Sequence, residues 1–226
     1  MSSAWRATAF GASIYLLIGA NLPYLPVWLE QSRGFSGAEI SSLVAVGILI
    51  RIFAGPIMAA RAEQNGLRGV LGQTSLVCLL AFAAVAPQAT PILVVFGLVT
   101  VTYVAWGVIM PLTDAVLLVE TKEQRPDYGA ARAIASASFI MASLAAGALV
   151  RLYGPEAAIW WLVGASALMV ITSFNLPKGT ALSGKRSSLR QTLREGFDLY
   201  RNRRILFAGL GASLIQAAHA LSLIHI

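Results

Sequence analysis

The sequence predicts an all-α integral membrane protein, in which a bundle of six transmembrane helices is followed by the start of a seventh. Of its 226 residues, 57% are hydrophobic and only 12% are charged, whereas a soluble domain carries about 25% charged residues. The mean hydropathy is +0.72. The apolar residues are gathered in runs long enough to cross a bilayer as helices, with polar or charged segments between them.

Composition also narrows the classes of function. The net charge is +7, but the basic residues lie in the connections between apolar runs, where they set membrane topology rather than form a nucleic-acid-binding face. The single cysteine, Cys78, lies inside an apolar run, so we expect a small buried side chain and neither a disulfide framework nor a zinc motif. The sequence contains no HExxH motif and no nucleophile–base set. We therefore expect no enzyme, no cofactor, no metal and no nucleic-acid partner.

Six apolar runs predict six complete membrane spans. The first run is too long for a signal peptide and lacks a small-residue cleavage site, so we expect it to remain as a span. Its Pro23 and Pro26 predict a kink whose freed carbonyls are satisfied by neighbouring helices. Ser36 and Glu39 predict a capping box before the second span, and the segment RAEQNGLRG predicts a short loop after it. The predicted spans are 7–29, 40–60, 70–86, 91–119, 130–152 and 157–176, with a seventh starting at 205.

The chain divides into four predicted segments. Residues 1–176 form the six-helix bundle, and 177–204 form a basic cytoplasmic linker with an amphipathic surface helix. Residues 205–220 begin the seventh span. The final segment, 221–226 (LSLIHI), resembles a translated sequencing adapter, so we interpret it as an artefact and the chain as a truncated reading frame, with an ordinary apolar helix end as the alternative. Six spans, a basic connector and a seventh span indicate half of a larger symmetric protein, whose first and second sets of three spans could form an inverted repeat.

The charges of the connections predict the orientation. Most of the 17 Lys and Arg residues lie near the N-terminus or in even-numbered connections, whereas the odd-numbered connections hold only Arg33 and Arg151. By the positive-inside rule the N-terminus is cytoplasmic. We expect the protein in the cytoplasmic (inner) membrane of a bacterium.

The connection between the fourth and fifth spans carries the central prediction. Asp114 lies inside the fourth apolar run and Arg132 opens the fifth, each nine residues from Glu123 in the middle of the turn. Two antiparallel helices joined there bring both side chains to about the same depth in the membrane. Ionisable residues at membrane depth face the bundle interior, pair with a partner and mark a pathway. We interpret the two as a transport site, with a purely structural ion pair as the alternative.

Further candidates share helix faces with this pair. Helical spacing defines one face of the fourth span, which carries Tyr103, Trp106, Met110 and Asp114. The same spacing defines a face of the fifth span, which carries Arg132, Ser136, Phe139 and Ser143. The aromatic stripe fits either packing or a binding cavity. Small residues of the fifth span, such as Ala142 and Gly147, favour close helix contacts.

Several motifs resemble the major facilitator superfamily over residues 10 to 220, and within it the phenylpropionate permease family and, more broadly, the lactose permease branch. GANLPYLPVWLE is similar to the first-span signature of that group, and VAVGILIRIFAGPIMA to the phenylpropionate permease second span, including its membrane arginine, Arg51. PLTDA followed by DYGAAR is the most specific match, and QAAHA is similar to the start of a seventh span. The resemblance implies the N-terminal six-helix bundle of that fold.

The resemblance also implies roles for single residues. In lactose permease-like proteins an acid and an arginine at this separation lie at the substrate site, which here gives Asp114 and Arg132. The remaining candidates for substrate binding or coupling are Asn21, Tyr24, Tyr103, Trp106, Ser136, Gln216 and His219. Candidates for a gating or structural role are Arg51, Glu63, Gly66 and Arg68. The chain departs from the family loop pattern at Ala59 and Gln64, and Ala130 stands where relatives often have a basic residue.

The function implied by the resemblance is secondary active transport by alternating access around a midplane site. We expect proton-coupled uptake of a small organic carboxylate, and the apolar cavity suits an aromatic acid. His219 is the one visible coupling candidate, with a hydrogen-bonded helix-packing residue as the alternative. Within the superfamily, a sugar- or nucleoside-type proton symporter and a drug efflux transporter remain alternatives. A non-transporting membrane sensor or scaffold is an alternative from a different class. The expected partners are the small-molecule substrate, protons and the lipid bilayer, the energy source is the proton gradient, and the full-length protein is expected to be a monomer.

Overall fold

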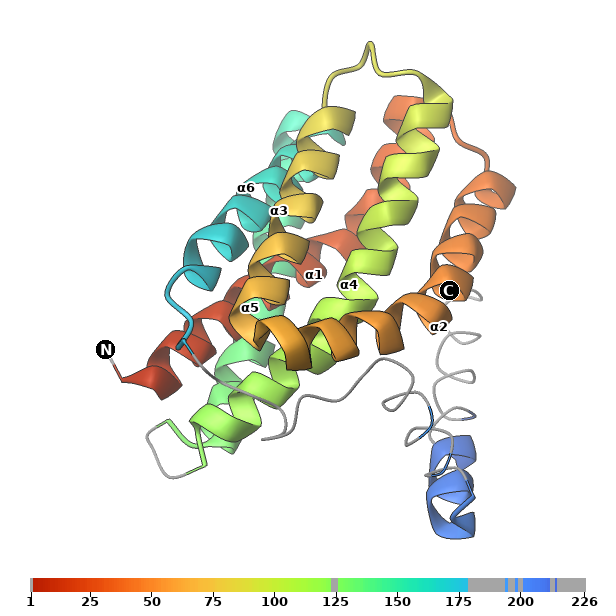
Figure 1. Ribbon diagram of the computed structural model, residues 1–226. Coiled ribbons are helices and arrows are strands. Elements are labelled where there is room, and N and C mark those ends of the chain that lie inside the picture. Colours follow the sequence, from red (N-terminus) through yellow and green to blue (C-terminus); the bar gives the residue numbers. More distant parts are fainter. Residues whose placement is uncertain are drawn as a thin grey trace. The chain divides into compact units, whose positions relative to one another are not determined.

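The computed structural model describes residues 2–122, 126–178, 194, 198, 201–211 and 214. Among these, six helices form the bundle shown in Figure 1, each long and apolar enough to cross a membrane. They are α1 (Ser3–Arg33), α2 (Gly37–Asn65), α3 (Leu67–Val85), α4 (Ile92–Glu120), α5 (Tyr128–Tyr153) and α6 (Glu156–Ser173). The predicted all-α six-helix bundle is thereby confirmed.

A second compact unit begins at Ser187. Within it, residues 203–211 are helical, where the seventh span is predicted to begin. Most of the predicted amphipathic linker helix, the sites Gln216 and His219, and the adapter-like segment 221–226 lie outside the described residues.

Local signals set the helix ends. At the start of α2 the Ser36 hydroxyl accepts a hydrogen bond from the Glu39 backbone N–H at 3.3 Å, and the Glu39 carboxylate accepts one from the Ser36 N–H at 2.8 Å. This confirms the predicted capping box. At the start of α5 the Asp127 carboxylate accepts from the Ala130 N–H at 2.9 Å. Each cap satisfies backbone donors that a helix start leaves without a partner.

The predicted loop RAEQNGLRG is wrong in its extent. Helix α2 runs on to Asn65 and α3 begins at Leu67, so that Gly66 alone separates them. The φ angle of Gly66 is +81°, in the region that favours glycine. Because glycine allows the chain to reverse at a single residue, the flanking polar residues are free to continue the two helices.

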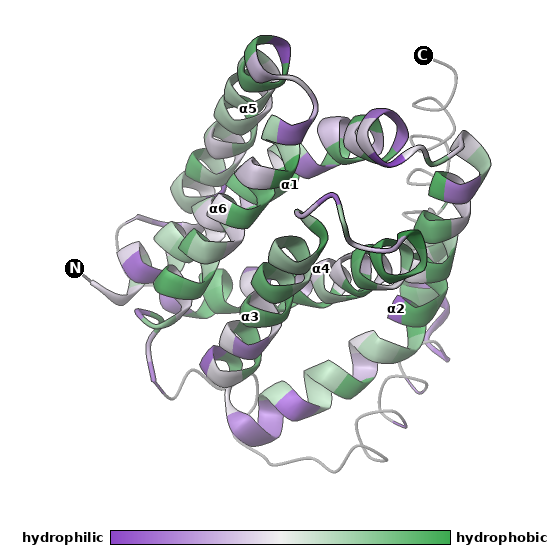
Figure 2. Ribbon diagram, turned by 90° about the horizontal axis from the view of Figure 1, so that it is seen from above, coloured by the Kyte–Doolittle hydropathy of each residue, from purple (hydrophilic) through white to green (hydrophobic). Residues whose placement is uncertain are grey.

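Helix packing repeats between the two halves of the bundle. Helix α1 packs mainly against α5 and α6, while α4 packs mainly against α2 and α3. Figure 2 accordingly shows α1, α5 and α6 on one side and α2, α3 and α4 on the other. The two remaining major contacts, α1 with α4 and α3 with α6, each pair corresponding helices of the two sets. Exchanging α1, α2 and α3 for α4, α5 and α6 therefore reproduces the packing, as a three-plus-three repeat requires.

A glycine followed four residues later by a proline occurs in the first helix of each set, as Gly19–Pro23 in α1 and Gly107–Pro111 in α4. Proline has no N–H, so each glycine carbonyl loses its helical hydrogen bond. The Ser143 hydroxyl of α5 donates to the Gly19 carbonyl at 2.6 Å, which confirms that a neighbouring helix satisfies the group freed by Pro23.

The α1–α5 contact is close enough to exclude single methyl groups. A Cβ on Gly19 would lie 2.4 Å from the Phe139 carbonyl oxygen, and one on Gly147 would lie 2.1 Å from the Tyr24 hydroxyl oxygen. That hydroxyl donates to the Ser143 carbonyl at 3.0 Å. Small residues thus let the two helices approach closely, as predicted for this helix, and a hydroxyl of each helix donates to a backbone carbonyl of the other.

A polar cluster joins α1, the α3–α4 turn and α6 at one end of the bundle. The Trp28 indole N–H donates to the Glu156 carboxylate at 3.0 Å, and the Gln88 amide donates to the same carboxylate at 3.2 Å. The Arg33 guanidinium lies over the Trp28 ring, 5.0 Å from its centroid, and donates to the carbonyls of Val85, Pro87 and Gln88. Arg33 therefore satisfies carbonyls that the end of α3 leaves open.

We predict that Gly19→Ala lowers thermal stability in detergent, because the new methyl group meets backbone rather than a movable side chain. Overpacking of this kind costs about 1–3 kcal/mol. The control is Gly164→Ala in α6, where nothing lies within 4 Å of the added Cβ. The control should match or exceed the wild-type midpoint, since alanine favours helix more than glycine does. Equal midpoints for the two variants would contradict the close α1–α5 packing.

We also predict that Trp28→Phe destabilises the bundle by about 1–3 kcal/mol, because it leaves the Glu156 carboxylate without its indole donor. The matched control is Trp160→Phe on α6, whose side chain is exposed. Denaturant unfolding of both variants in the same detergent measures the difference. A loss no larger at Trp28 than at Trp160 would show that the cluster does not stabilise the fold.

Candidate functional site

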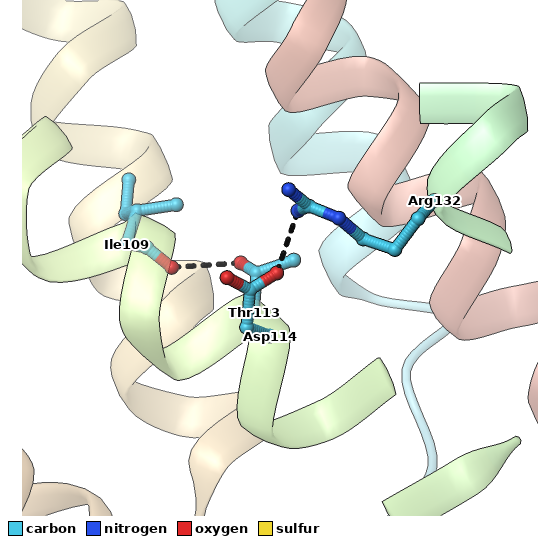
Figure 3. Close-up of polar contacts among 4 residues, drawn as sticks. All are labelled: Ile109, Thr113, Asp114 and Arg132. Carbon is cyan, nitrogen blue, oxygen red and sulfur yellow. Dashed lines mark hydrogen bonds and ion pairs between the residues drawn. The ribbon is translucent and has the colours of Figure 1, made fainter. Parts of the chain in front are cut away.

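Asp114 of α4 and Arg132 of α5 form an ion pair. The Arg132 Nη1 donates to the Asp114 Oδ1 at 2.7 Å, and Figure 3 shows the arginine side chain extended from α5 to α4. The preceding Thr113 hydroxyl donates back to the Ile109 carbonyl at 2.8 Å. The predicted contact is thus present. The Arg132 and Asp114 side chains are 35% and 38% exposed, so both keep hydrogen-bonding capacity for a further group.

The pair does not lie at the middle of its helices. Asp114 is less than two turns from the end of α4 at Glu120, and Arg132 is about one turn after the start of α5 at Tyr128. The two side chains therefore share one depth, as predicted, but this depth is near the ends of α4 and α5 that face their connection. Glu123, the predicted centre of that connection, lies outside the described residues.

Tyr15 of α1 provides a third contact for the pair. The Arg132 guanidinium carbon lies 5.2 Å from the centroid of the Tyr15 ring, within the range of a cation–π interaction. Sequence reasoning missed this residue, because no local spacing links a tyrosine of the first span to an arginine of the fifth. The contact places α1, α4 and α5 around one charged group.

The predicted aromatic stripe of α4 is present. The ring centroids of Tyr103 and Trp106 are 6.1 Å apart with an interplanar angle of 56°. Tyr103 also lies against α2, where a Cβ on Gly47 would be 2.8 Å from the Tyr103 Cβ. The Trp106 Nε1 is buried and has no hydrogen-bond partner among the described residues. An unpaired buried donor is uncommon and suits a polar ligand atom.

The other candidates Tyr24, Asn21 and Ser136 differ in their position relative to the ion pair. Tyr24 is held by Ser143, three turns along α5 from Arg132. Asn21 is buried in α1, and its Oδ1 has no partner among the described residues. Ser136 is exposed one turn after Arg132, on the same side of α5. Of these three, Ser136 is therefore the one positioned by its helix to join the Asp114–Arg132 pair.

The residues predicted for gating divide into two places. Glu63, Gly66 and Arg68 lie at the α2–α3 junction, where Gly66 and Arg68 line a pocket of about 500 Å³ that extends to the end of α6. Arg51 is instead the central residue of α2. Its side chain lies across Gly107 of α4, so closely that a Cβ there would be 1.6 Å from the Arg51 Cδ.

Metal-binding side chains do not gather in the part of the chain that the structure describes: no group of three or more His, Cys, Asp or Glu side chains occurs there. The Asp114–Arg132 pair and Arg51 are suited to hydrogen bonds with anionic or hydroxyl groups.

Comparison with known proteins agrees with this arrangement. Residues 9–222 match the model of the MFS_1 like family. Curated relatives include the uncharacterized transporter YwbF of Bacillus subtilis, 24% identical over 196 residues that make up 85% of this chain and 47% of the relative. The maltose permease of Geobacillus stearothermophilus is 29% identical over 64% of this chain and 38% of its own. The probable 3-phenylpropionic acid transporter of Escherichia coli is 29% identical over 67% of this chain and 40% of its own.

The chain spans less than half the length of these relatives. Its six apolar helices, their repeated packing and the family match over nearly the whole chain lead to the same conclusion. The chain is an integral membrane protein that belongs to the MFS_1 like family of major facilitator superfamily transporters.

Proposed function

We propose that the protein containing this chain is a secondary active transporter that takes up a small aromatic carboxylate together with protons. The observation that carries this proposal is the Asp114–Arg132 pair, a partly exposed ion pair on the same face of α4 as Tyr103 and Trp106. Ionisable groups within membrane-spanning helices are costly and mark substrate or ion pathways. Alternating access exposes such a site to each side of the membrane in turn.

The chemistry of the pair suits polar substrate groups. A guanidinium holds several N–H donors in one plane, so Arg132 can keep its bond to Asp114 and still donate to a carboxylate or hydroxyl oxygen. Asp114 fixes the arginine in the empty site and can accept from a hydroxyl. Aromatic surface from Tyr103 and Trp106 would hold the apolar part of the substrate. The probable 3-phenylpropionic acid transporter among the relatives supports an aromatic acid as the substrate class.

A sugar is the second candidate substrate. An ion pair is neutral overall and offers both a donor and an acceptor, which matches the hydroxyl groups of a sugar. The maltose permease among the relatives favours this alternative. Uptake assays with an aromatic acid and with maltose distinguish the two.

The proposal includes the orientation of the bundle and the membrane in which it lies. Arg6 near the start of α1, Arg61 near the end of α2 and Arg68 at the start of α3 lie at one end of the bundle, and Arg33 and Arg151 lie at the other. By the positive-inside rule the first end faces the cytoplasm of a bacterial inner membrane. His219, the one coupling candidate of this chain, lies outside the described residues, so proton coupling rests on the family and is tested by collapsing the proton gradient.

We predict that Arg132→Ala in the full-length transporter lowers uptake of labelled 3-(4-hydroxyphenyl)propionate at least tenfold, because it removes the cationic donor and leaves Asp114 unpaired. Asp114→Asn should lower uptake less, since an amide still holds the arginine by a hydrogen bond. The control is Arg151→Ala, an exposed arginine at the other end of α5, which should transport as the wild type does. Membrane levels of all variants are compared by immunoblot.

Wild-type uptake by Arg132→Ala would overturn the site assignment. Absence of uptake of both 3-(4-hydroxyphenyl)propionate and maltose by the wild type would overturn the proposed substrate classes. Uptake that persists after a protonophore has collapsed the gradient would overturn proton coupling.

A further inference from the structure

Arg51 is a cation in the middle of an apolar helix. It is the central residue of the 29-residue helix α2, so about 20 Å of helix lies on either side of it. Its neighbours Ile48, Leu49, Ile52 and Phe53 are exposed and apolar. An arginine near a helix end can extend its charge to the membrane surface, but one at mid-span is too far from either end to do so. Such a residue is expected to face a partner or a water-filled cavity.

The side chain of Arg51 follows the surface of α4. A Cβ on Gly107 would lie 1.6 Å from its Cδ, 2.4 Å from its Cγ and 2.8 Å from its Nε. The apolar stem of the arginine therefore occupies the space that the missing side chain of Gly107 leaves open. The Gly107–Pro111 spacing matches the Gly19–Pro23 spacing of α1, where Ser143 donates to the freed carbonyl. In the α2–α4 pair the polar side chain beside the glycine is Arg51, which is charged, whereas in the α1–α5 pair it is Ser143.

Arg51 lies on the face of α4 that also carries the ion pair. Gly107 and Asp114 are seven residues apart, nearly two full turns, so they share a face at a separation of about 10 Å along the helix. Met110 lies on the same face between them and is half-buried, and Trp106 stands next to Gly107. Two guanidinium groups, from α2 and α5, therefore meet one face of α4, with Met110 between them and Trp106 beside Gly107.

The two arginines differ in their partners. Arg132 donates to Asp114 and lies over Tyr15. Among the described residues, Arg51 has no hydrogen bond and no ion pair with any group. The nearest acid along α4 is Asp114, which Arg132 already holds. A mid-span cation that has no counter-charge among the described residues is suited to bind an anion.

We propose that Arg51 binds the carboxylate of the substrate, and that the Asp114–Arg132 pair binds a hydroxyl at its other end. The assignment rests on the proposed function and narrows it to aromatic acids with a polar group opposite the carboxylate, such as 3-(4-hydroxyphenyl)propionate. The free guanidinium takes the charged group because it gains a counter-ion there. The neutral pair takes the hydroxyl, which can both donate and accept. Met110 and Trp106 contact the ring between them.

The test measures binding to the purified full-length transporter in detergent, with 3-(4-hydroxyphenyl)propionate and its amide as ligands. The two ligands have the same shape and differ in charge. The wild type should bind the acid at least tenfold more tightly than the amide. Arg51→Gln should reduce this preference to less than threefold while the ligand-free protein remains at least as thermostable as the wild type, because no internal partner is lost. Arg51→Lys should keep part of the preference.

Gly107→Ala provides a second test that keeps every charge. Its methyl group takes the space of the Arg51 stem and displaces the guanidinium, so affinity for the acid should fall while affinity for the amide changes little. The matched control is Gly97→Ala in the same helix, where nothing lies within 4 Å of the added Cβ. Arg151→Gln controls for loss of a positive charge elsewhere.

The outcomes separate the two proposals. A preference for the acid that survives Arg51→Gln, in a wild type that transports it, overturns the role of Arg51 alone. A marked loss of ligand-free stability in Arg51→Gln also overturns it, because it would show a structural partner. A wild type that binds neither ligand overturns both this assignment and the proposed function.

Discussion

The bundle depends on close helix packing at two glycine–proline steps, one in α1 and one in α4, in a medium without water. Pro23 and Pro111 each remove one helical donor, and an unsatisfied carbonyl in the bilayer costs several kcal/mol. The Ser143 hydroxyl donates to the Gly19 carbonyl. This contact requires α5 to approach so closely that a methyl group on Gly19 does not fit. At Gly107 the side chain of Arg51 lies against the glycine, so α2 also packs closely on α4. Two glycine–proline steps thus fix the positions of α2 and α5, the helices that carry both membrane arginines.

The charges of the bundle differ in what they contribute. Arg33 satisfies backbone carbonyls at the end of α3, and its role is structural. The side chains of Asp114 and Arg132 are both more than a third exposed, and ion pairs with that exposure contribute about 0–1 kcal/mol to stability. Arg51 has no counter-charge among the described residues and on energetic grounds opposes folding. A contribution to stability therefore accounts well for Arg33, poorly for the Asp114–Arg132 pair and not at all for Arg51.

Sequence reasoning predicted the features that depend on local or symmetric spacing. Apolar runs located all six helices, Ser36 and Glu39 marked a capping box, and equal distances from a turn predicted the contact of Asp114 with Arg132. It missed contacts between residues far apart in the chain, such as Tyr15 with Arg132 and Trp28 with Glu156. It also overestimated the α2–α3 loop, because the reversal at Gly66 depends on a backbone angle rather than on polarity. The position of Arg51 over Gly107 required knowing which helices are neighbours.

The contacts between the two sets of three helices have a consequence for the proposed transport. Trp28, Gln88 and Glu156 join α1, the α3–α4 turn and α6 at one end, so α1 and α6 are expected to move together, whereas α2 packs mainly on α4. In the proposed binding mode, a substrate that contacts Arg51 and Arg132 connects α2 of the first set with α5 of the second through the face of α4. A ligand shifts a conformational equilibrium only by its difference in affinity for the two states. If the separation of α2 and α5 differs between the two states, a substrate that contacts both Arg51 and Arg132 binds the two states with different affinity. A ligand that contacts only one of these arginines does not sense that separation.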